Sequence, residues 1–491
     1  MNLRIKSLDD ILATAEKKSL HRSLGGVQLM LLGIGAVIGT GIFVLTAEAA
    51  QKAGPGMLLS FVIAGFVCAM TALCYAELAS MVPVSGSAYT YSYAVMGEVV
   101  AWIVGWALIL EYAVAASAVS VGWSNYFVPL VERAFGFRVP IEFAKGPFAG
   151  GVVNLPAILI AGLVTALLYV GTRESARVNS VLVAIKVTAL TVFCFYALPA
   201  VQSANFEPFM PLGFVGVSGA AASIFFAYVG FDAVSTAAEE TKDPQRNIPI
   251  GLIGSLAICT VFYLLVASGA IGSIGAQPVM QSPGVGFAPG TPELVAACKI
   301  AANAAALPCS DEALAHVLRQ IGATKIASLI GLAAFLALPS VILTMLFGQT
   351  RIFFVMSRDG LLPAAFSKVH ARFKTPHVIT LITGTSVAFA AAFLPVGKLA
   401  DFSNAGTLCA FAAVSIGVMV LRVRDPRRPR SFRTPALWFV GPAAFLGCLF
   451  LFYSLDITSK LVFLGWGALG LTVYFGYGRS RSQLAPGRSG G

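Results

Sequence analysis

Long apolar runs, separated by short polar segments, repeat along this chain from beginning to end. A helix crosses the hydrocarbon core of a bilayer with about twenty mostly apolar residues, and the runs have that length. The pattern predicts an all-α, polytopic membrane protein with about twelve transmembrane helices. The predicted spans are residues 25–50, 55–80, 97–122, 152–171, 179–200, 213–237, 251–271, 326–350, 377–396, 402–422, 434–455 and 459–478. A lipid-facing β-barrel is excluded, because its strands would be short and alternating.

The segments outside these runs predict one transmembrane domain over residues 25–478, since most connections are brief. The exception is the segment 272–325, for which we expect short helices because long structureless loops are uncommon. Residues 1–24 form a polar, amphipathic arm without the apolar core of a signal peptide. Residues 479–491 are rich in Gly, Ser, Arg and Pro and predict a disordered tail.

Composition agrees with a membrane protein, since 57% of the residues are hydrophobic and 11% are charged. The net charge is +11, and its placement predicts an orientation. With both termini in the cytoplasm, 23 Lys and Arg lie in cytoplasmic segments, nine lie in outer segments and Lys186 lies in a span. This is the positive-inside distribution. We therefore expect a multi-pass protein of the plasma (inner) membrane, in which basic residues attract anionic lipid and no nucleic acid binds.

The eight cysteines divide into two groups. Six lie in apolar runs, where we expect small packing residues: Cys68, Cys74, Cys194, Cys259, Cys409 and Cys448. Cys298 and Cys309 both fall in the segment 272–325, where a disulfide and two free thiols are both open interpretations. The chain has no CxxC pair, so neither a metal nor a cofactor is expected.

Two apolar runs contain residues that weaken a helix. GIGAVIGTGIF (33–43) has four glycines in the first span, and SIFFAYVGFDAVSTAAEE (223–240) has Gly230 and Asp232 in the sixth. Each interior glycine costs about 1 kcal/mol relative to alanine. Interrupted helices five spans apart are typical of inverted five-helix repeats with a binding site at the breaks. The alternative is that the glycines only permit close helix packing.

These stretches also resemble a known family. GIGAVIGTGIF, AGPGMLLSFVIAG (53–65), YAELASMVPVSGSAYTYSY (75–93), FFAYVGFDAVSTAAEETKDPQRNIPIG (225–251) and GQTRIFFVMSRDGLLP (348–363) resemble amino-acid permeases of the APC superfamily. The resemblance covers about residues 20–480 and is greatest to the cationic amino-acid transporter branch and its bacterial relatives. It implies a five-plus-five inverted repeat with broken helices 1 and 6, followed by two C-terminal helices.

The resemblance also implies a function. It is that of a secondary active transporter that imports amino acids, driven by protons, with Arg, Lys or ornithine favoured. Import or exchange of small neutral amino acids such as alanine is the alternative. A small accessory membrane helix is left open as a partner.

A broken helix suits an amino acid, because free N–H groups favour its carboxylate and unwound carbonyls accept from its ammonium. The predicted carboxylate contacts are Gly39, Thr40 and Gly41. The predicted ammonium contacts are the carbonyls of Val37, Ile38, Phe226, Ala227 and Val229. The resemblance implies the same backbone stretches and makes Phe226 a gate over the substrate, whereas the alternative for Phe226 is core or lipid packing.

Two carboxylates lie near these breaks. Glu111 is in the middle of the third span, where three roles are open: negative charge for a cationic substrate, a partner for Lys186, or a protonated structural group. Asp232 faces the same pocket or caps the second half of helix 6. For Glu77, near the inner end of the second span, we expect structural hydrogen bonds.

Lys186 is deep in the fifth span, and an ionisable residue there indicates function by default. The resemblance implies that its ammonium occupies the place where sodium-coupled relatives bind Na⁺. Ser340 and Thr344, in the eighth span, are candidate hydroxyl partners for this ammonium. The alternative is that the side chain snorkels to the membrane surface.

Other classes of protein are less consistent with the sequence. A membrane enzyme would need a catalytic pair or metal ligands in the bundle, but the chain has no HExxH motif, and its four histidines fall in loops or at span ends. A channel fits a broken-helix site with one titratable amine less well than a transporter does. A sensor that binds amino acids without transporting them stays open.

Overall fold

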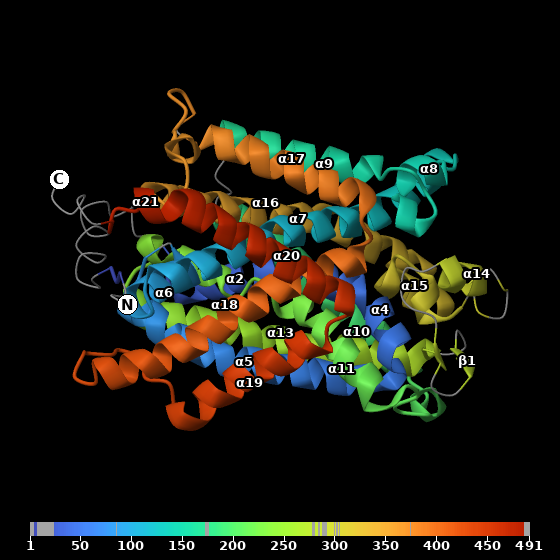
Figure 1. Ribbon diagram of the computed structural model, residues 1–491. Helices are drawn as coiled ribbons and strands as arrows, with labels where there is room; N and C mark the ends of the chain where they lie inside the picture. The colour runs from blue at the N-terminus through green and yellow to red at the C-terminus, as the bar shows by residue number, and fades with distance from the viewer. Residues whose placement is uncertain are drawn as a thin grey trace.

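The computed structural model describes residues 4–6, 24–84, 86–171, 176–276, 280–282, 285–286, 292–298, 300, 303, 305–373 and 375–485. Its long helices run side by side along one axis (Figure 1). We call the end with residues 4–6 and α21 (Arg479–Arg481) the terminal end, and the end with α14 (Pro292–Cys298) and α15 (Ala313–Gln320) the loop end.

The first half of the chain begins with a helix in three pieces, α2 (Gly26–Val37), α3 (Thr40–Phe43) and α4 (Leu45–Ala53). The helices that follow it are η1 (Gly54–Gly56), α5 (Met57–Met81), α6 (Ser87–Val95), α7 (Glu98–Phe135), α8 (Ile141–Ala144), η2 (Pro147–Ala149), α9 (Leu155–Val170), α10 (Ala176–Ala197), η3 (Leu198–Ala200) and η4 (Ser203–Phe206).

The second half begins with another helix in pieces, α11 (Gly213–Ile224), η5 (Phe225–Tyr228), α12 (Ala233–Thr236) and η6 (Ala238–Glu240). The remaining elements are α13 (Pro244–Ile274), β1 (Met280–Ser282), β2 (Val285–Gly286), η7 (Leu307–Cys309), α16 (Thr324–Arg358), η8 (Ala364–Ser367), α17 (His377–Phe393), α18 (Val396–Arg424), α19 (Leu437–Ser454), α20 (Ile457–Val473) and η9 (Tyr474–Gly478).

Helices cover every apolar run predicted to span a membrane. Within the described residues, nine helices are long and apolar enough to cross a bilayer. Three further apolar helices, α2, α9 and α17, are shorter. The architecture is therefore that of a polytopic helical membrane protein, whereas the count of twelve spans and the inverted repeat stay predictions.

The centre of the bundle is built on α7, a long helix that packs along both α16 and α18. The broken helices pack against this frame and against α13, which lies along both α2 and α5. The frame thus holds long continuous helices, and the interrupted ones lie beside it.

Both interruptions expected from the sequence are present. In the first, Ile38 is extended and Gly39 is non-helical before α3 begins. In the second, Gly230 has φ +114°, a conformation that L side chains rarely adopt. A Cβ at Gly230 would also lie 3.1 Å from the carbonyl group of Ala36. Glycine at 230 therefore allows the second break to pack against the first helix.

The packing interpretation also holds, but for different glycines of the first span. A Cβ at Gly33 would lie 2.5 Å from Ser255 Oγ, and one at Gly35 would lie 2.9 Å from Val183. Both distances are shorter than real Cβ contacts, so these two positions need glycine for close helix packing.

The chain ends differ from the expectation of a disordered tail. Arg479–Arg481 is helical, Ser482 donates to Glu98, and the Gln483 amide donates to the Asp359 carbonyl at 3.0 Å. Residues 479–485 are thus packed against the bundle, because the carboxylate and carbonyl acceptors at the ends of α7 and α16 bind them. Residues 486–491, and residues 1–3 and 7–23 of the predicted arm, lie outside the described residues.

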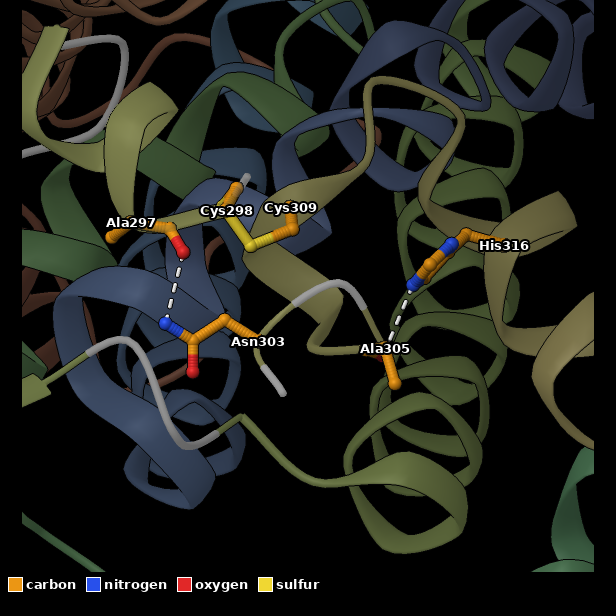
Figure 2. The surroundings of a disulfide bond; sticks show 6 residues. All are labelled: Ala297, Cys298, Asn303, Ala305, Cys309 and His316. Carbon is orange, nitrogen blue, oxygen red and sulfur yellow. Dashed lines mark hydrogen bonds between the residues drawn. A yellow bond between two sulfur atoms is a disulfide. The ribbon is translucent and has the colours of Figure 1, made fainter. Parts of the chain in front are cut away.

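At the loop end, the segment 272–325 contains the short helices α14, η7 and α15 and one antiparallel strand pair. Figure 2 shows that Cys298 and Cys309 are joined by a disulfide, so the free-thiol interpretation is wrong. Asn303 Nδ2 donates to the Ala297 carbonyl at 2.9 Å in the same loop. Burial lowers the pKa of His316, whose Nε2 lies 3.0 Å from the Ala305 carbonyl.

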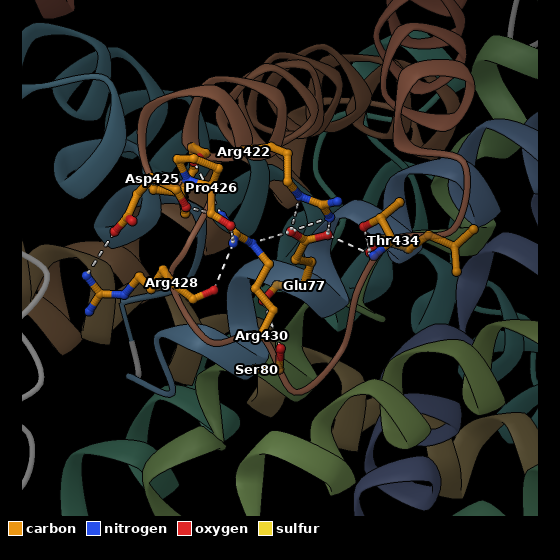
Figure 3. Close-up of polar contacts among 10 residues, drawn as sticks. Glu77, Ser80, Arg422, Asp425, Pro426, Arg428, Arg430 and Thr434 are labelled. Atoms are coloured by element: carbon orange, nitrogen blue, oxygen red, sulfur yellow. Dashed lines mark hydrogen bonds and ion pairs between the residues drawn. The ribbon is translucent and has the colours of Figure 1, made fainter.

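Glu77 has the structural role expected for it. Figure 3 shows its carboxylate between Arg422 and Arg430, with Arg422 Nη2 at 2.7 Å from Oε1 and Arg430 Nε at 3.0 Å. The Thr434 amide donates to the same carboxylate at 2.8 Å. The buried acid therefore ties α5 to the connection between α18 and α19.

Candidate functional site

The two helix breaks meet at Gly41. A Cβ at this position would lie 2.3 Å from Ala227 Cα and 2.6 Å from Ala227 Cβ, distances that real side chains do not show. Gly41 is in α3, and Ala227 is in η5. The predicted carboxylate and ammonium contacts are therefore brought together at one place, where only glycine permits the approach.

Two of the predicted ammonium acceptors share one partner. The Tyr263 hydroxyl, on α13, lies 2.8 Å from the Val37 carbonyl and 2.7 Å from the Ala227 carbonyl. A hydroxyl has one proton to donate, so it satisfies one carbonyl fully at a time. Tyr263 thus joins the breaks, and sequence reasoning missed it because it is one aromatic residue in a continuous apolar run.

The other backbone positions of the site are close to these. Ile38 has an extended ψ, and the Phe226 carbonyl accepts from the Val229 amide at 3.2 Å, which turns the chain after η5. Phe226 is buried in the core, and its role as a gate stays a prediction.

Thr40 has an unusual environment beside the break. Its side chain is fully buried, and Oγ1 has no hydrogen-bond partner among the described residues. A Cβ at Gly122 of α7 would lie 2.5 Å from this hydroxyl, so glycine makes room for it. A buried polar atom without a partner is costly, and at this position a substrate oxygen would supply the partner.

Glu111 and Asp232 lie in the interior next to the breaks, and both are 0% exposed. The Tyr112 hydroxyl donates to Asp232 Oδ2 at 2.9 Å. Asp232 Oδ1 and both carboxylate oxygens of Glu111 have no hydrogen-bond partner among the described residues. A hydrogen bond between Glu111 and Lys186 is therefore not observed. Asp232 precedes α12 but makes no side-chain cap, contrary to the capping alternative.

Lys186 is 0% exposed, so the snorkelling interpretation is wrong. Its Nζ donates to the Gly35 carbonyl at 2.6 Å and to Ser340 Oγ at 3.3 Å. Thr344 Oγ1 donates to the Ser340 carbonyl at 2.9 Å, one turn away. The amine of α10 thus contacts both the frame helix α16 and α2, three residues before the break begins at Ile38.

A second lysine inside the bundle, the half-buried Lys52 of α4, lies towards the loop end. Its Nζ is 2.8 Å from Glu48 and 3.5 Å from Asp401, and it also donates to Ser223 Oγ. Ser223 in turn donates to Asp401 Oδ1 at 2.6 Å. The sequence placed Lys52 in a connection, so this cluster was missed.

The Lys52 cluster borders a cavity of about 320 Å³. Charged residues at the loop end line part of its wall: Lys145, Asp311, Lys398 of α18 and Asp456. The ion pair with Asp311 raises the pKa of Lys145. Two oppositely charged pairs, Lys145–Asp311 and Lys398–Asp456, therefore line this cavity.

Comparison with known proteins places these features in a family. Residues 24–469 match the model of the family described as amino acid permease. The chain is 45% identical to the branched-chain amino acid permease BcaP of Bacillus subtilis and 42% identical to the methylthioribose transporter of that species, each over 98% of both chains. It is 36% identical to cationic amino acid transporter 9 of Arabidopsis thaliana, over 86% of this chain and 70% of the relative.

These relatives are named as transporters, which supports transport rather than enzymatic catalysis. The cationic transporter shares less identity than the two bacterial proteins do, so the comparisons do not support the cationic preference expected from the sequence. The chain belongs to the amino acid permease family within the APC superfamily.

Proposed function

We propose that this protein imports amino acids across the plasma membrane by proton-coupled transport, with its terminal end in the cytoplasm. The observation that carries the proposal is the contact of the two helix breaks at Gly41 and Ala227, with the buried amine of Lys186 bound to the same broken helix. The distribution of Lys and Arg supports the orientation.

The substrate is held mainly by backbone. Its carboxylate accepts from the amides and hydroxyl of Gly39, Thr40 and Gly41, and Thr40 Oγ1 gains the partner that it lacks. Its ammonium donates to carbonyls of the two breaks, including those near the Tyr263 hydroxyl. These groups are already in place, so binding costs little reorganisation.

Lys186 supplies the coupling. In its charged form it donates to the Gly35 carbonyl and to Ser340, and so holds α2 against α16. Loss of the proton removes the charge-assisted character of these bonds, which are stronger than neutral ones. Proton binding and release at Lys186 would therefore change how firmly the first half of the broken helix 1 is held.

Two classes of substrate side chain each have an observation in their favour. The buried and unpartnered Glu111 carboxylate favours a cationic side chain, because an isolated buried charge is costly and a cation would offset that cost. The relative at 45% identity is named for branched-chain amino acids, which favours an uncharged side chain and a protonated, neutral Glu111.

Uptake into proteoliposomes tests transport and coupling together. Labelled arginine, leucine and alanine are supplied with and without an inward proton gradient, and sodium is replaced by choline. We expect accumulation that needs the proton gradient and is unchanged by choline. Binding without uptake of any substrate would instead indicate a sensor.

Glu111→Gln separates the two substrate classes. If Glu111 contacts a cationic side chain, this change weakens arginine binding by about 1.5–3 kcal/mol, the range for hydrogen bonds to charged groups, and leaves leucine binding unchanged. Competition binding to the purified protein measures both affinities. Equal losses for the two amino acids would assign Glu111 a structural role.

A further inference from the structure

The proposed function leaves one sequence feature without a role, the pair of motifs EETKDPQRNIPIG and GQTRIFF at the terminal end. Arg351 of GQTRIFF connects them. Its Nη1 donates to the Thr236 carbonyl at 3.0 Å, and its Nη2 donates to Glu240 Oε1 at 3.3 Å. The guanidinium therefore binds the last carbonyl of α12 and the carboxylate that ends η6.

The geometry of this contact suits a guanidinium. A planar fork of donors can bind a carbonyl and a carboxylate at once, which a lysine cannot do in the same way. The guanidinium also stacks on Phe347, with its carbon atom 4.0 Å from the ring centroid. The Arg351 side chain is thus held by the Phe347 ring on one face of the guanidinium and by hydrogen bonds at its edge.

The backbone of Glu240 also binds the segment that leads into helix 1. The Leu24 amide donates to the Glu240 carbonyl at 3.0 Å, and the Lys242 amide donates to the Leu24 carbonyl at 2.8 Å. Leu24 lies two residues before the first residue of α2, Gly26. The terminal-end halves of both broken helices are therefore joined to each other by backbone bonds, and Arg351 joins this unit to the frame.

The same stripe of α16 carries both Arg351 and the proton site. Ser340 and Arg351 are eleven residues apart, which returns to nearly the same face of a helix after about three turns. Ser340 contacts Lys186, Phe347 stacks under Arg351, and Arg351 contacts helix 6. One face of α16 thus binds helix 1 near its break, through Lys186, and the ends of both broken helices about 16 Å further along.

We propose that Arg351 keeps the site closed at the terminal end. It holds the joined ends of the broken helices against α16. Its contacts with Thr236 and Glu240 must break before the site opens towards the terminal end. Arg351 is a positioning residue, since it acts on the substrate site through Thr236 and Glu240. The proposal gives the EETKDP motif its role as the movable half of this contact. It rests on the transport function proposed above only for its consequence, release of substrate.

Cysteine labelling tests the closure without substrate. The six thiol cysteines are replaced by alanine, and single cysteines are introduced at Ala233, 4% exposed beside the second break, or at Ala47, which lines the loop-end cavity. A polar maleimide is then applied to the purified protein. Arg351→Gln should raise the labelling rate at position 233 about tenfold, because it removes two charge-assisted hydrogen bonds that oppose opening, and should not raise it at position 47.

Arg358→Gln is the matched control, since Arg358 lies two turns further along the same helix, is exposed and stacks on Phe354 at 5.7 Å. The labelling rate at position 233 in Arg358→Gln should equal the rate in the protein with Arg358 and Arg351 unchanged. Glu240→Gln approaches the contact from the other side and should raise labelling at position 233 by a smaller factor. An unchanged rate at position 233 in both Arg351→Gln and Glu240→Gln would overturn the proposal, as would an equal rise at positions 233 and 47. Since no substrate is used, these outcomes stand whether or not the protein transports amino acids.

Discussion

Two lysines on opposite sides of the helix breaks, the buried Lys186 and the half-buried Lys52, have contrasting environments. Lys186 donates to two uncharged oxygens, the Gly35 carbonyl and the Ser340 hydroxyl. Lys52 lies between two carboxylates, Glu48 and Asp401. The described hydrogen bonds of the Lys186 amine are to dipoles, and those of the Lys52 amine include full negative charges.

The difference indicates different tasks. A carboxylate close to an ammonium favours the charged form strongly, so the cluster around Lys52 is a fixed ion pair that ties α4 to α18 and, through Ser223, to α11. Uncharged oxygens stabilise an ammonium much less in a buried place. This contrast supports the proposal that Lys186 exchanges its proton, whereas Lys52 holds structure.

The largest effect is expected at the site that Lys186 serves. Gly41→Leu should abolish substrate binding, because even a Cβ at this position would lie 2.3 Å from Ala227 Cα and would force the breaks apart. The affinity of purified, monodisperse Gly41→Leu protein for labelled amino acid measures this loss. Gly162→Leu, at a position with open space around it, is the control and should bind normally. Normal affinity in Gly41→Leu would mean that the meeting of the breaks is not the site.

The next effect tests the contrast directly. Lys186→Arg should lose proton-driven accumulation while keeping substrate binding, because arginine does not release its proton at any relevant pH. Lys52→Arg should keep accumulation, because its charge needs only to persist. Both are measured as uptake into proteoliposomes at an outside pH of about 5.5 and 7.5, across the range in which acid should stimulate import. Normal accumulation by Lys186→Arg would make Lys186 a structural cation.

A feature of the fold or of the site could be predicted from the sequence where the residues that reveal it lie in one short stretch. The glycines of GIGAVIGTGIF and the single amine of SVLVAIKVTAL are visible in short stretches, and the breaks and the buried Lys186 are where the pattern placed them. Tyr263 and Asp401 gain their roles only from helices far away in the chain. Tertiary contacts of this kind leave no periodicity or motif near the residue itself.

The same limit explains why residues 479–485 differ from the expected disordered tail. The composition of residues 479–485 is that of a flexible tail, but the acceptors that bind it, Glu98 and Asp359, lie at the ends of distant helices. A Cβ at Gly360, where φ is +81°, would lie 2.3 Å from the Arg481 carbonyl. The SRDG motif thus provides a docking place for the tail, which no property of the tail sequence reveals.

Stability gives a further test of the two lysines. Lys52→Met should destabilise the protein by about 1–3 kcal/mol, less than the 3–5 kcal/mol of a fully buried broken pair, because Lys52 keeps 23% of its side chain exposed. Lys186→Met should lower the free energy of unfolding by less than Lys52→Met does, or not at all, since it removes a desolvated cation whose described hydrogen bonds are to neutral oxygens. Thermal unfolding in detergent compares the two. Adding Asp401→Asn to Lys52→Met should recover part of the loss, and the opposite ranking of the two lysines would contradict the comparison.

The smallest effect concerns Asp456, which pairs with Lys398 at the loop end and accepts from the Ser459 amide at 2.9 Å as the cap of α20. Partial burial alone would raise the pKa of Asp456, but the hydrogen bonds from Lys398 and Ser459 lower it overall. Its contribution to stability is therefore present above the unfolded pKa of about 3.9 and is lost only as the pH falls below that value. Asp456→Asn keeps a good capping residue and removes the charge, so it should cost about 0.2–1 kcal/mol, as for an exposed ion pair. The ratio of uptake at pH 5.5 to uptake at pH 7.5 should be unchanged in this variant, because a carboxylate with a lowered pKa does not titrate in that range. If Asp456→Asn abolished the stimulation by acid, the loop-end charges rather than Lys186 would carry the response to protons.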